Sequence, residues 1–134
     1  MYCLDTNILS YLTSGKYPKL DEKIDQIGLD KICTTVITQN ELFFGCYNNP
    51  SKTQQLLAIY KNYFSVIPVL PLEKNISDIF AKTKYQLKTK GIVIGDSDLL
   101  IGCVCLCKKM ILITNNTKHF SQIDGLELED WTKI

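Results

Sequence analysis

Short apolar runs rich in β-branched residues alternate with longer amphipathic segments along this chain, and this alternation restricts its fold more than any other feature. The runs that predict strands cover residues 1–4, 31–36, 66–70 and 110–114, and a shorter run at 126–129 could add a last strand. The segments between them predict helices. Strands that alternate with helices form a parallel sheet covered on both faces. The sequence therefore predicts an α/β fold of three layers, α/β/α, with a central, mostly parallel sheet of four or five strands.

The length of the chain predicts one domain over residues 1–134, because domains cluster at about 100–150 residues. Its hydrophobic fraction of 46% and charged fraction of 22% are usual for a soluble globular protein. No stretch approaches the roughly 20 apolar residues of a membrane span. The start of the chain also lacks the basic segment and apolar run of a signal peptide. We therefore expect a cytoplasmic protein that does not enter a membrane.

Six cysteines occur, each in an apolar context: Cys3, Cys33, Cys46, Cys103, Cys105 and Cys107. A free thiol behaves as a small buried hydrophobe, which favours core packing. A zinc site at Cys103, Cys105 and Cys107 is the alternative. On a helix, however, Cys105 points away from the other two, and no paired His or second CxxC motif completes four ligands.

The opening stretch MYCLDTNILS joins the first expected strand to a helix start through Asp5, Thr6 and Asn7. In an open α/β sheet the chemistry lies beyond the carboxyl ends of the strands, so Asp5 is a candidate wall of an active site. The competing interpretation is that Asp5 or Asn7 only caps the helix, since both residue types accept hydrogen bonds from free amide groups there. These ten residues alone do not decide between the two.

Three further acids stand at expected helix starts. Glu41 follows the second strand in a capping-box pattern with Thr38, and Asp96 and Asp98 flank Ser97 before the apolar run LLIGCVCLC. Each has a structural alternative: Glu41 could bind the Thr38 amide, and Asp96 could be a helix N-cap with Asp98 in the first turn. Helices that follow parallel strands begin at the same edge of a sheet, however, so these acids are expected to approach Asp5.

Carboxylates that converge with no Arg or His beside them repel one another unless protons or a cation neutralise them. Hard oxygen ligands select Mg²⁺ or Mn²⁺, and such a metal can activate water for attack on a phosphodiester. The sequence lacks the residues and motifs that competing chemistries require. The single His119 has no nucleophile-elbow partner, and neither GxGxxG nor GxxxxGK[ST] is present. Divalent-metal phosphodiester hydrolysis remains.

Five blocks of the sequence resemble the successive motifs of PIN-domain ribonucleases, and more narrowly the VapC toxins of toxin–antitoxin pairs: MYCLDTNILSYL, VITQNELFFG, GDSDLLIGCVC, ILITNNTKHF and GLELEDW. The resemblance implies a PIN-like fold and a Mg²⁺- or Mn²⁺-dependent endoribonuclease that cleaves structured RNA such as tRNA or rRNA and stops translation. It also implies a VapB-like antitoxin that wraps the toxin, and toxins that pair as homodimers.

The resemblance assigns roles to individual residues. Asp5, Glu41 and Asp98 would hold the metal, and Thr6 and Asn7 would position Asp5 and its water. Thr114 and Asn116 match the polar pair that orients the site.

Two departures concern the block after the fourth strand. Family members often carry a fourth acid there, where this chain has Asn115, Asn116 and His119, and their frequent Arg is Asn115 here. Asp96 could supply the missing metal ligand. The departures leave open whether one metal ion binds or two.

The net charge is only +1, and no Arg is present. We therefore do not expect a strongly basic surface that binds nucleic acid non-specifically. A local basic patch remains open. The candidate RNA contacts are lysines, four of them crowding one helix end near the loop GIVIG: Lys82, Lys84, Lys88, Lys90 and, by the polar turn, Lys118. A solvated helix face explains the first four as well as an RNA footprint does.

Alternative interpretations also exist for the residues that could bind an antitoxin and for the activity. Tyr11, Phe43, Phe44 and Tyr47 are apolar enough for a partner groove, although core packing is favoured for most of them. A PIN-like module that has lost turnover and only holds RNA or protein is the alternative to the endoribonuclease. A structure-specific DNA nuclease would use the same acidic site.

Overall fold

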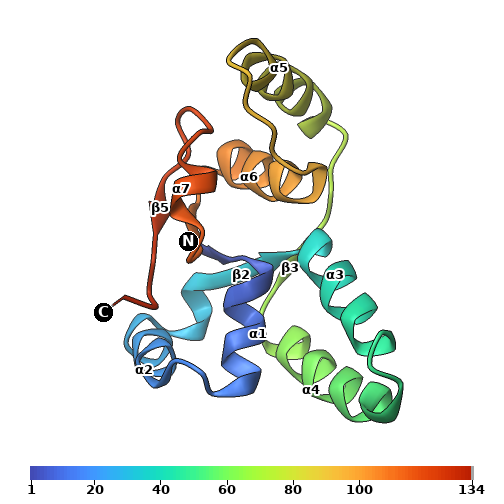
Figure 1. Cartoon of the computed structure of the whole chain (residues 1–134). Coiled ribbons are helices and arrows are strands. Elements are labelled where there is room, and N and C mark those ends of the chain that lie inside the picture. The colour runs from blue at the N-terminus through green and yellow to red at the C-terminus, as the bar shows by residue number, and fades with distance from the viewer. Residues whose placement is uncertain (134) are drawn as a thin grey trace.

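The computed structural model describes residues 1–133 as a five-stranded, all-parallel sheet in the order β3-β2-β1-β4-β5 (Figure 1). The strands are β1 (Tyr2–Leu4), β2 (Ile32–Thr35), β3 (Val69–Leu70), β4 (Ile111–Ile113) and β5 (Leu128–Glu129). The helices are α1 (Thr6–Ser14), α2 (Pro18–Ile27), α3 (Val36–Tyr47), α4 (Thr53–Val66), α5 (Ile76–Thr89), α6 (Asp96–Lys108) and α7 (Thr117–Phe120). The predicted three-layer α/β fold with a parallel sheet is confirmed.

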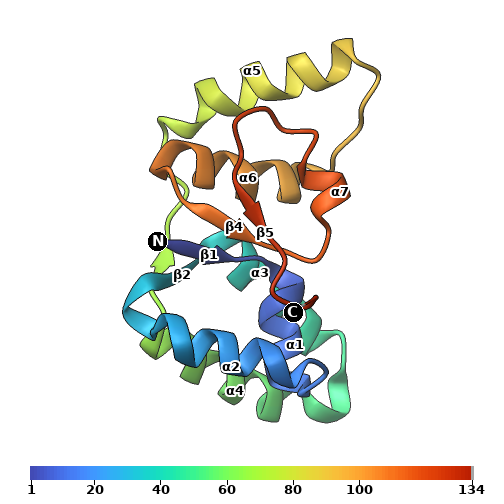
Figure 2. The same ribbon diagram turned by 90° about the vertical axis from the view of Figure 1, so that its left-hand side faces the viewer.

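Successive side chains of the strands point to opposite faces of the sheet, and a separate hydrophobic core lies on each face. Cys3 of β1 and Leu112 of β4 belong to the core formed with α5 and α6, whereas Leu4 and Ile113 belong to the core formed with α1, α2 and α4. Figure 2 shows the same division, with α5 and α6 above the strands and α1, α2 and α4 below them. Both layers are therefore needed to bury this sheet.

The apolar helix α6 is buried on most sides, as the sequence predicts. Ile101, Cys103, Val104 and Cys105 have no exposed surface. All six cysteines are free, and no cluster of metal-binding side chains that includes them occurs within residues 1–133. Core packing is confirmed for the five buried thiols, and Cys107 is half-buried. No helix in this part of the chain is long and apolar enough to cross a membrane.

Two local predictions are wrong. The polar turn predicted around Lys118 contains the helix α7. The capping box at Thr38 is also displaced, because α3 begins at Val36 and its N-cap is Thr35, whose hydroxyl accepts the Thr38 amide at 3.2 Å.

Candidate active site

Asp5 stands where β1 ends, and it caps α1. Its Oδ1 accepts a hydrogen bond from the Ile8 amide at 3.0 Å, and the residue is only 5% exposed. A carboxylate can accept several hydrogen bonds at once, so Asp5 can cap the helix and still bind another ligand. The cap interpretation of Asp5 is correct, and it also fixes the carboxyl group at the carboxyl end of a central strand.

Glu41 is held by the opening block rather than by its own helix. Thr6 Oγ1 donates to Glu41 Oε1 at 2.6 Å, and the same hydroxyl lies 3.2 Å from Thr38 Oγ1. Because α3 begins at Val36, Glu41 lies in the second turn, beyond reach of the free amides. Thr6 therefore positions Glu41, whereas the resemblance implied that Thr6 would position Asp5.

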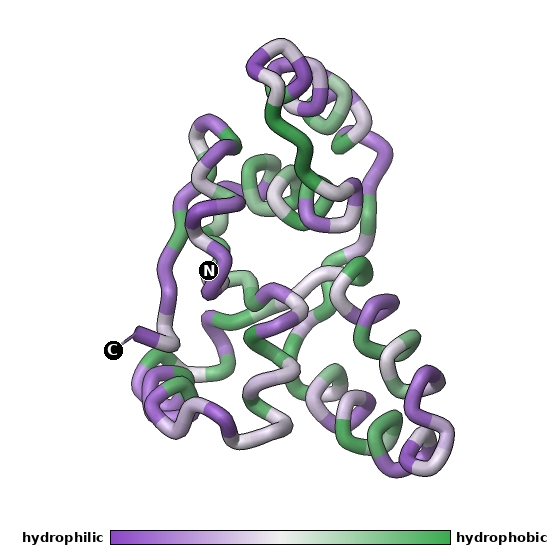
Figure 3. The backbone as a smooth tube through the Cα atoms, in the orientation of Figure 1, coloured by the Kyte–Doolittle hydropathy of each residue, from purple (hydrophilic) through white to green (hydrophobic). Residues whose placement is uncertain are grey.

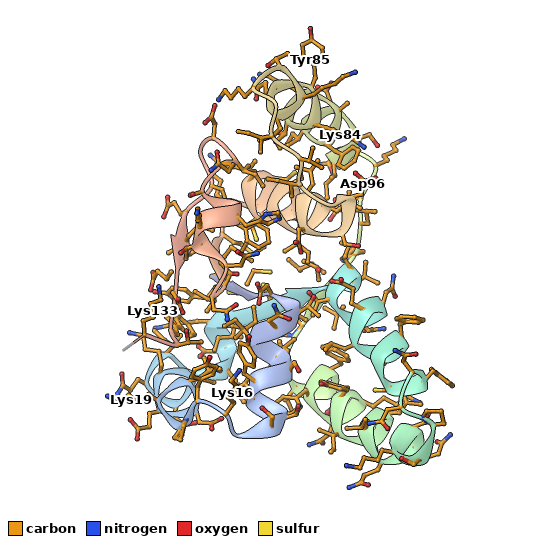
Figure 4. All side chains as sticks on the ribbon, in the orientation of Figure 1. Lys16, Lys19, Lys84, Tyr85, Asp96 and Lys133 are labelled. Atoms are coloured by element: carbon orange, nitrogen blue, oxygen red, sulfur yellow. The ribbon has the colours of Figure 1, made fainter. Side chains whose placement is uncertain are left out.

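The two acids at the start of α6 diverge. Residues two apart on a helix are separated by about 200° around its axis. Asp98 faces the cavity lined by Asp5. Asp96 instead pairs with Lys84 at 2.9 Å, with 63% of its side chain exposed (Figure 4). The N-cap of α6 is Gly95, so the predicted Asp96 cap is wrong, and the structure does not bring Asp96 to the other carboxylates.

A cavity of about 220 Å³ collects most of the predicted site residues at the carboxyl edge of the sheet. Its lining comes from α1, α3, α6 and the segment around α7: Asp5, Thr6, Asn7, Glu41, Asp98, Asn116 and Phe120. Thr114 lies behind this lining, fully buried, and its Oγ1 accepts the Asn116 amide at 3.0 Å. Phe120 was not predicted, because an apolar residue in a polar turn gives no chemical signal.

His119 touches the acids, contrary to the expectation that no His stands beside them. Its Nε2 lies 3.3 Å from Asp98 Oδ2, and this buried nitrogen forms no hydrogen bond with any residue in 1–133. Helix α7, which the sequence predicted as a polar turn, places His119 beside Asp98. The sequence signal was its place in the block where a fourth acid is frequent.

The electrostatics of the cavity favour a positive ligand. The pKa of Asp5 rises from 3.8 to about 6, first because burial disfavours its charge and further because Asp98 and Glu41 repel it. Hydrogen bonds from Thr114 and the Ile8 amide oppose the rise of this pKa. Among the described residues, none that lines the cavity is basic, and the imidazole beside it, His119, contacts Asp98. Asp5 and Glu41 have no basic side chain paired with them within residues 1–133.

The donor set suits a hydrated hard cation. Within residues 1–133, no three His, Cys, Asp or Glu side chains lie close enough together to form a closed set of ligands. Mg²⁺ usually keeps several waters and binds through one or two carboxylates, so a cavity that carboxylates surround fits it better than a tight cage would. Asp5, Glu41 and Asp98 are the residues that could hold the ion.

The raised pKa of Asp5 predicts a pH-dependent stability for the metal-free protein. Between about pH 4 and pH 6 the folded chain keeps a proton on Asp5 that the unfolded chain has lost, so the free energy of unfolding falls as pH rises. A pKa rise from 3.8 to about 6 corresponds to roughly 3 kcal/mol. Asp5→Asn should remove this loss, because an amide carries no charge and still caps a helix.

Urea unfolding in EDTA at a series of pH values measures this effect in both proteins. We expect Asp5→Asn to be the more stable protein at pH 7, with a margin that shrinks toward pH 4. A margin that does not change with pH would contradict the assignment of the buried charge to Asp5.

The predicted lysines lie outside the acidic cavity. Lys84 binds Asp96, and Lys90 lies 3.6 Å from Asp124. Lys82, Lys88 and Lys118 form no ion pair with any residue in 1–133. Their role as RNA contacts stays a prediction.

The aromatic residues considered for a partner groove divide into two pairs. Phe44 and Tyr47 of α3 are 71% and 64% exposed, whereas Phe43 packs edge-on against Phe64 and Tyr11 against Tyr17. Core packing is therefore correct for Phe43 and Tyr11 and wrong for Phe44 and Tyr47.

The carboxyl edge of the parallel sheet thus brings Asp5, Glu41 and Asp98 to one cavity, as the resemblance to PIN-domain nucleases predicts. The family model described as PIN domain matches residues 2–126. The chain belongs to the PIN domain family.

Within that family, the chain is similar to proteins named VapC. It is 34% identical over 134 residues to Ribonuclease VapC1 of Haemophilus influenzae, covering 99% of each chain. It is 27% identical to the tRNA(fMet)-specific endonuclease VapC of Shigella flexneri, covering 98% of each. The solved structure of VapBC-1 from nontypeable Haemophilus influenzae aligns with a TM-score of 0.89 at 31% identity, covering 98% of each chain.

Proposed function

We propose that the protein is a Mg²⁺-dependent endoribonuclease of the VapC type, with Mn²⁺ as a possible substitute, that hydrolyses phosphodiester bonds of structured RNA such as tRNA or rRNA. The observation that carries this proposal is the cavity that Asp5, Glu41 and Asp98 share, whose lining includes no lysine. The names of relatives also support the proposal: two relatives that are 34% and 27% identical over nearly the full length are named a ribonuclease and a tRNA(fMet)-specific endonuclease.

Asp5, Glu41 and Asp98 would hold the ion. When bound, Mg²⁺ supplies a water of lowered pKa and neutralises charge that develops on the phosphate. The chain's own polar residues keep the acids ready for it. Thr6 fixes the Glu41 carboxylate through a 2.6 Å hydrogen bond, and the Ile8 amide fixes Asp5.

The remaining lining orients the substrate. The exposed side chains of Asn7 and Asn116 can donate to phosphate oxygens. Phe120, buried at 1% exposure, closes the floor of the cavity against water. Neutral donors beside three carboxylates admit a phosphate without cancelling the charge that attracts the metal.

The partner would be a VapB-like antitoxin, since structures similar to this chain are VapBC complexes. The exposed pair Phe44 and Tyr47 on α3 is the surface that we assign to it, because exposed aromatic side chains are enriched at protein interfaces. We further propose a homodimer that acts on RNA in the cytoplasm.

The test is cleavage of a total RNA pool by purified protein with Mg²⁺, with Mn²⁺ and with EDTA. We expect fragments with either metal and none in EDTA, because the chelator removes the ion that would activate the attacking water. A single-stranded DNA pool run in parallel tests the DNA-nuclease alternative.

Absence of metal-stimulated cleavage of any RNA would overturn the proposal. Retained RNA binding in that case would support a PIN-like module that binds RNA without cleaving it. That alternative is motivated by His119, which stands where relatives often carry a fourth acid.

A further inference from the structure

A second hollow opens directly beside the acidic cavity, along α7 and the connection between α5 and α6. It measures about 310 Å³ and is lined by Ile92, Asn116, Lys118, His119 and Gln122. Asn116 lines both spaces, and His119 reaches Asp98 at 3.3 Å. The two spaces are therefore neighbours, with Asn116 common to both linings.

The chemistry of the second hollow differs from that of the first. Its lining, all within the described residues, contains no acid, but it combines an apolar side chain, an imidazole ring, two amides and an ammonium group. Unstacked RNA bases are recognised by stacking on flat or apolar groups and by hydrogen bonds along their edges. Amide side chains offer a donor and an acceptor to a base edge, and Lys118 offers a charge to a phosphate.

The size of the hollow also restricts its occupant. Ligand sites span roughly 300–1,000 Å³, and this one, at about 310 Å³, lies at the lower end. It suits one nucleotide rather than a folded partner.

A third space shares Ile92 with this hollow. It measures about 260 Å³, and its lining is mainly apolar with two lysines, of which Lys84 is paired with Asp96 and Lys88 forms no ion pair within residues 1–133. The lining residues are Lys84, Leu87, Lys88, Gly91, Ile92, Val93, Ile94 and Leu99. Val93 is 91% exposed, and Figure 3 shows the α5–α6 connection as a hydrophobic stretch. An exposed apolar loop between lysines fits single-stranded RNA, whose bases need an apolar face and whose backbone needs positive charge.

We propose that the nucleotide next to the scissile phosphate lies in the hollow formed by Ile92, Asn116, Lys118, His119 and Gln122, and that the RNA strand continues from there over residues 91–95. This inference rests on the proposed nuclease function. It makes Gln122 and His119 determinants of which base is accepted beside the cleaved bond, and Lys118 a phosphate contact.

The first experiment maps cleavage products of a short RNA of random sequence. Wild-type protein should prefer certain bases at one position beside the cut, and Gln122→Ala should flatten that preference several-fold while the other positions keep theirs. Gln54→Ala, an exposed glutamine on α4, is the matched control. Cleavage with the same base preference in Gln122→Ala would overturn the subsite and leave the nuclease function intact, whereas no cleavage by wild type would overturn the function itself.

The second experiment needs no turnover. The cleavage-deficient Asp5→Asn protein is crosslinked to the same RNA carrying 4-thiouridine, and its salt-dependent binding is measured. We expect crosslinks to residues 91–95 and α7, and Lys118→Ala should lower the salt slope by roughly 0.7, the value for one lost phosphate contact on a single strand. Lys19→Ala on α2 should leave the slope unchanged.

Crosslinks confined to another face, or an unchanged slope in Lys118→Ala, would overturn the proposal. Loss of RNA crosslinks with retained binding of a VapB-like peptide in the hollow would assign it to the antitoxin instead.

Discussion

The Asp5→Asn variant is expected to lose metal-stimulated RNA cleavage, with kcat falling roughly 10³-fold. Asn keeps the shape of the side chain and the cap on the Ile8 amide, but it removes the one buried charge among the three acids. A metal ion supplies several kcal/mol of stabilisation to the transition state, and each 1.36 kcal/mol is worth tenfold in rate. Single-turnover cleavage of a labelled RNA with Mg²⁺ measures the change.

Asp25→Asn is the matched control, because Asp25 is an exposed aspartate on α2 far from the sheet's carboxyl edge. It should cleave RNA at the wild-type rate. Asp5→Asn should also be more stable than wild type at pH 7 without metal, so lost activity cannot be attributed to unfolding. Equal cleavage by Asp5→Asn and wild type would remove Asp5 from the mechanism.

The fold could be predicted largely because its strands are short and its central strands are buried. Runs such as KICTTV and ILIT carry the β-branched pattern of strands between helices, and alternation of the two elements requires a parallel sheet. Boundaries were harder to predict. The capping-box pattern predicted a helix start at Thr38, but Thr35, an equally good capping residue three positions earlier, is the N-cap and its hydroxyl accepts the Thr38 amide.

The site could be predicted as far as parallel topology determines it. Acids after β1 and β2 must meet at one edge of the sheet, so Asp5 and Glu41 followed from strand order. Asp96 and Asp98 could not be separated in sequence, because only the rotation of α6 decides which of them faces the cavity. His119 could not be placed either, since four residues of α7 are too short to give a periodic pattern.

Trp131→Ala should cause the largest loss of stability among single substitutions considered for this chain, about 3–5 kcal/mol, the usual cost of removing a buried aromatic side chain. Trp131 is 2% exposed, its ring lies 5.2 Å from that of Tyr2, and its Nε1 donates to Glu129 at 3.0 Å. It therefore fastens β5, a strand of two residues, to the centre of the sheet. Stabilities of small domains amount to about 5–15 kcal/mol, so urea unfolding would detect the change easily.

The same substitution should also disturb the acidic cavity, because β5 pairs with β4 and Thr114 directly follows β4. The Thr114 amide donates to the Glu129 carbonyl at 3.1 Å, and the Thr114 hydroxyl is one of the groups that hold down the pKa of Asp5. Trp131→Phe separates the contributions: it keeps most of the packing and loses only the bond to Glu129, at about 1 kcal/mol. If Trp131→Ala cost no more than Trp131→Phe, the aromatic packing on Tyr2 would not be what holds β5 in the sheet.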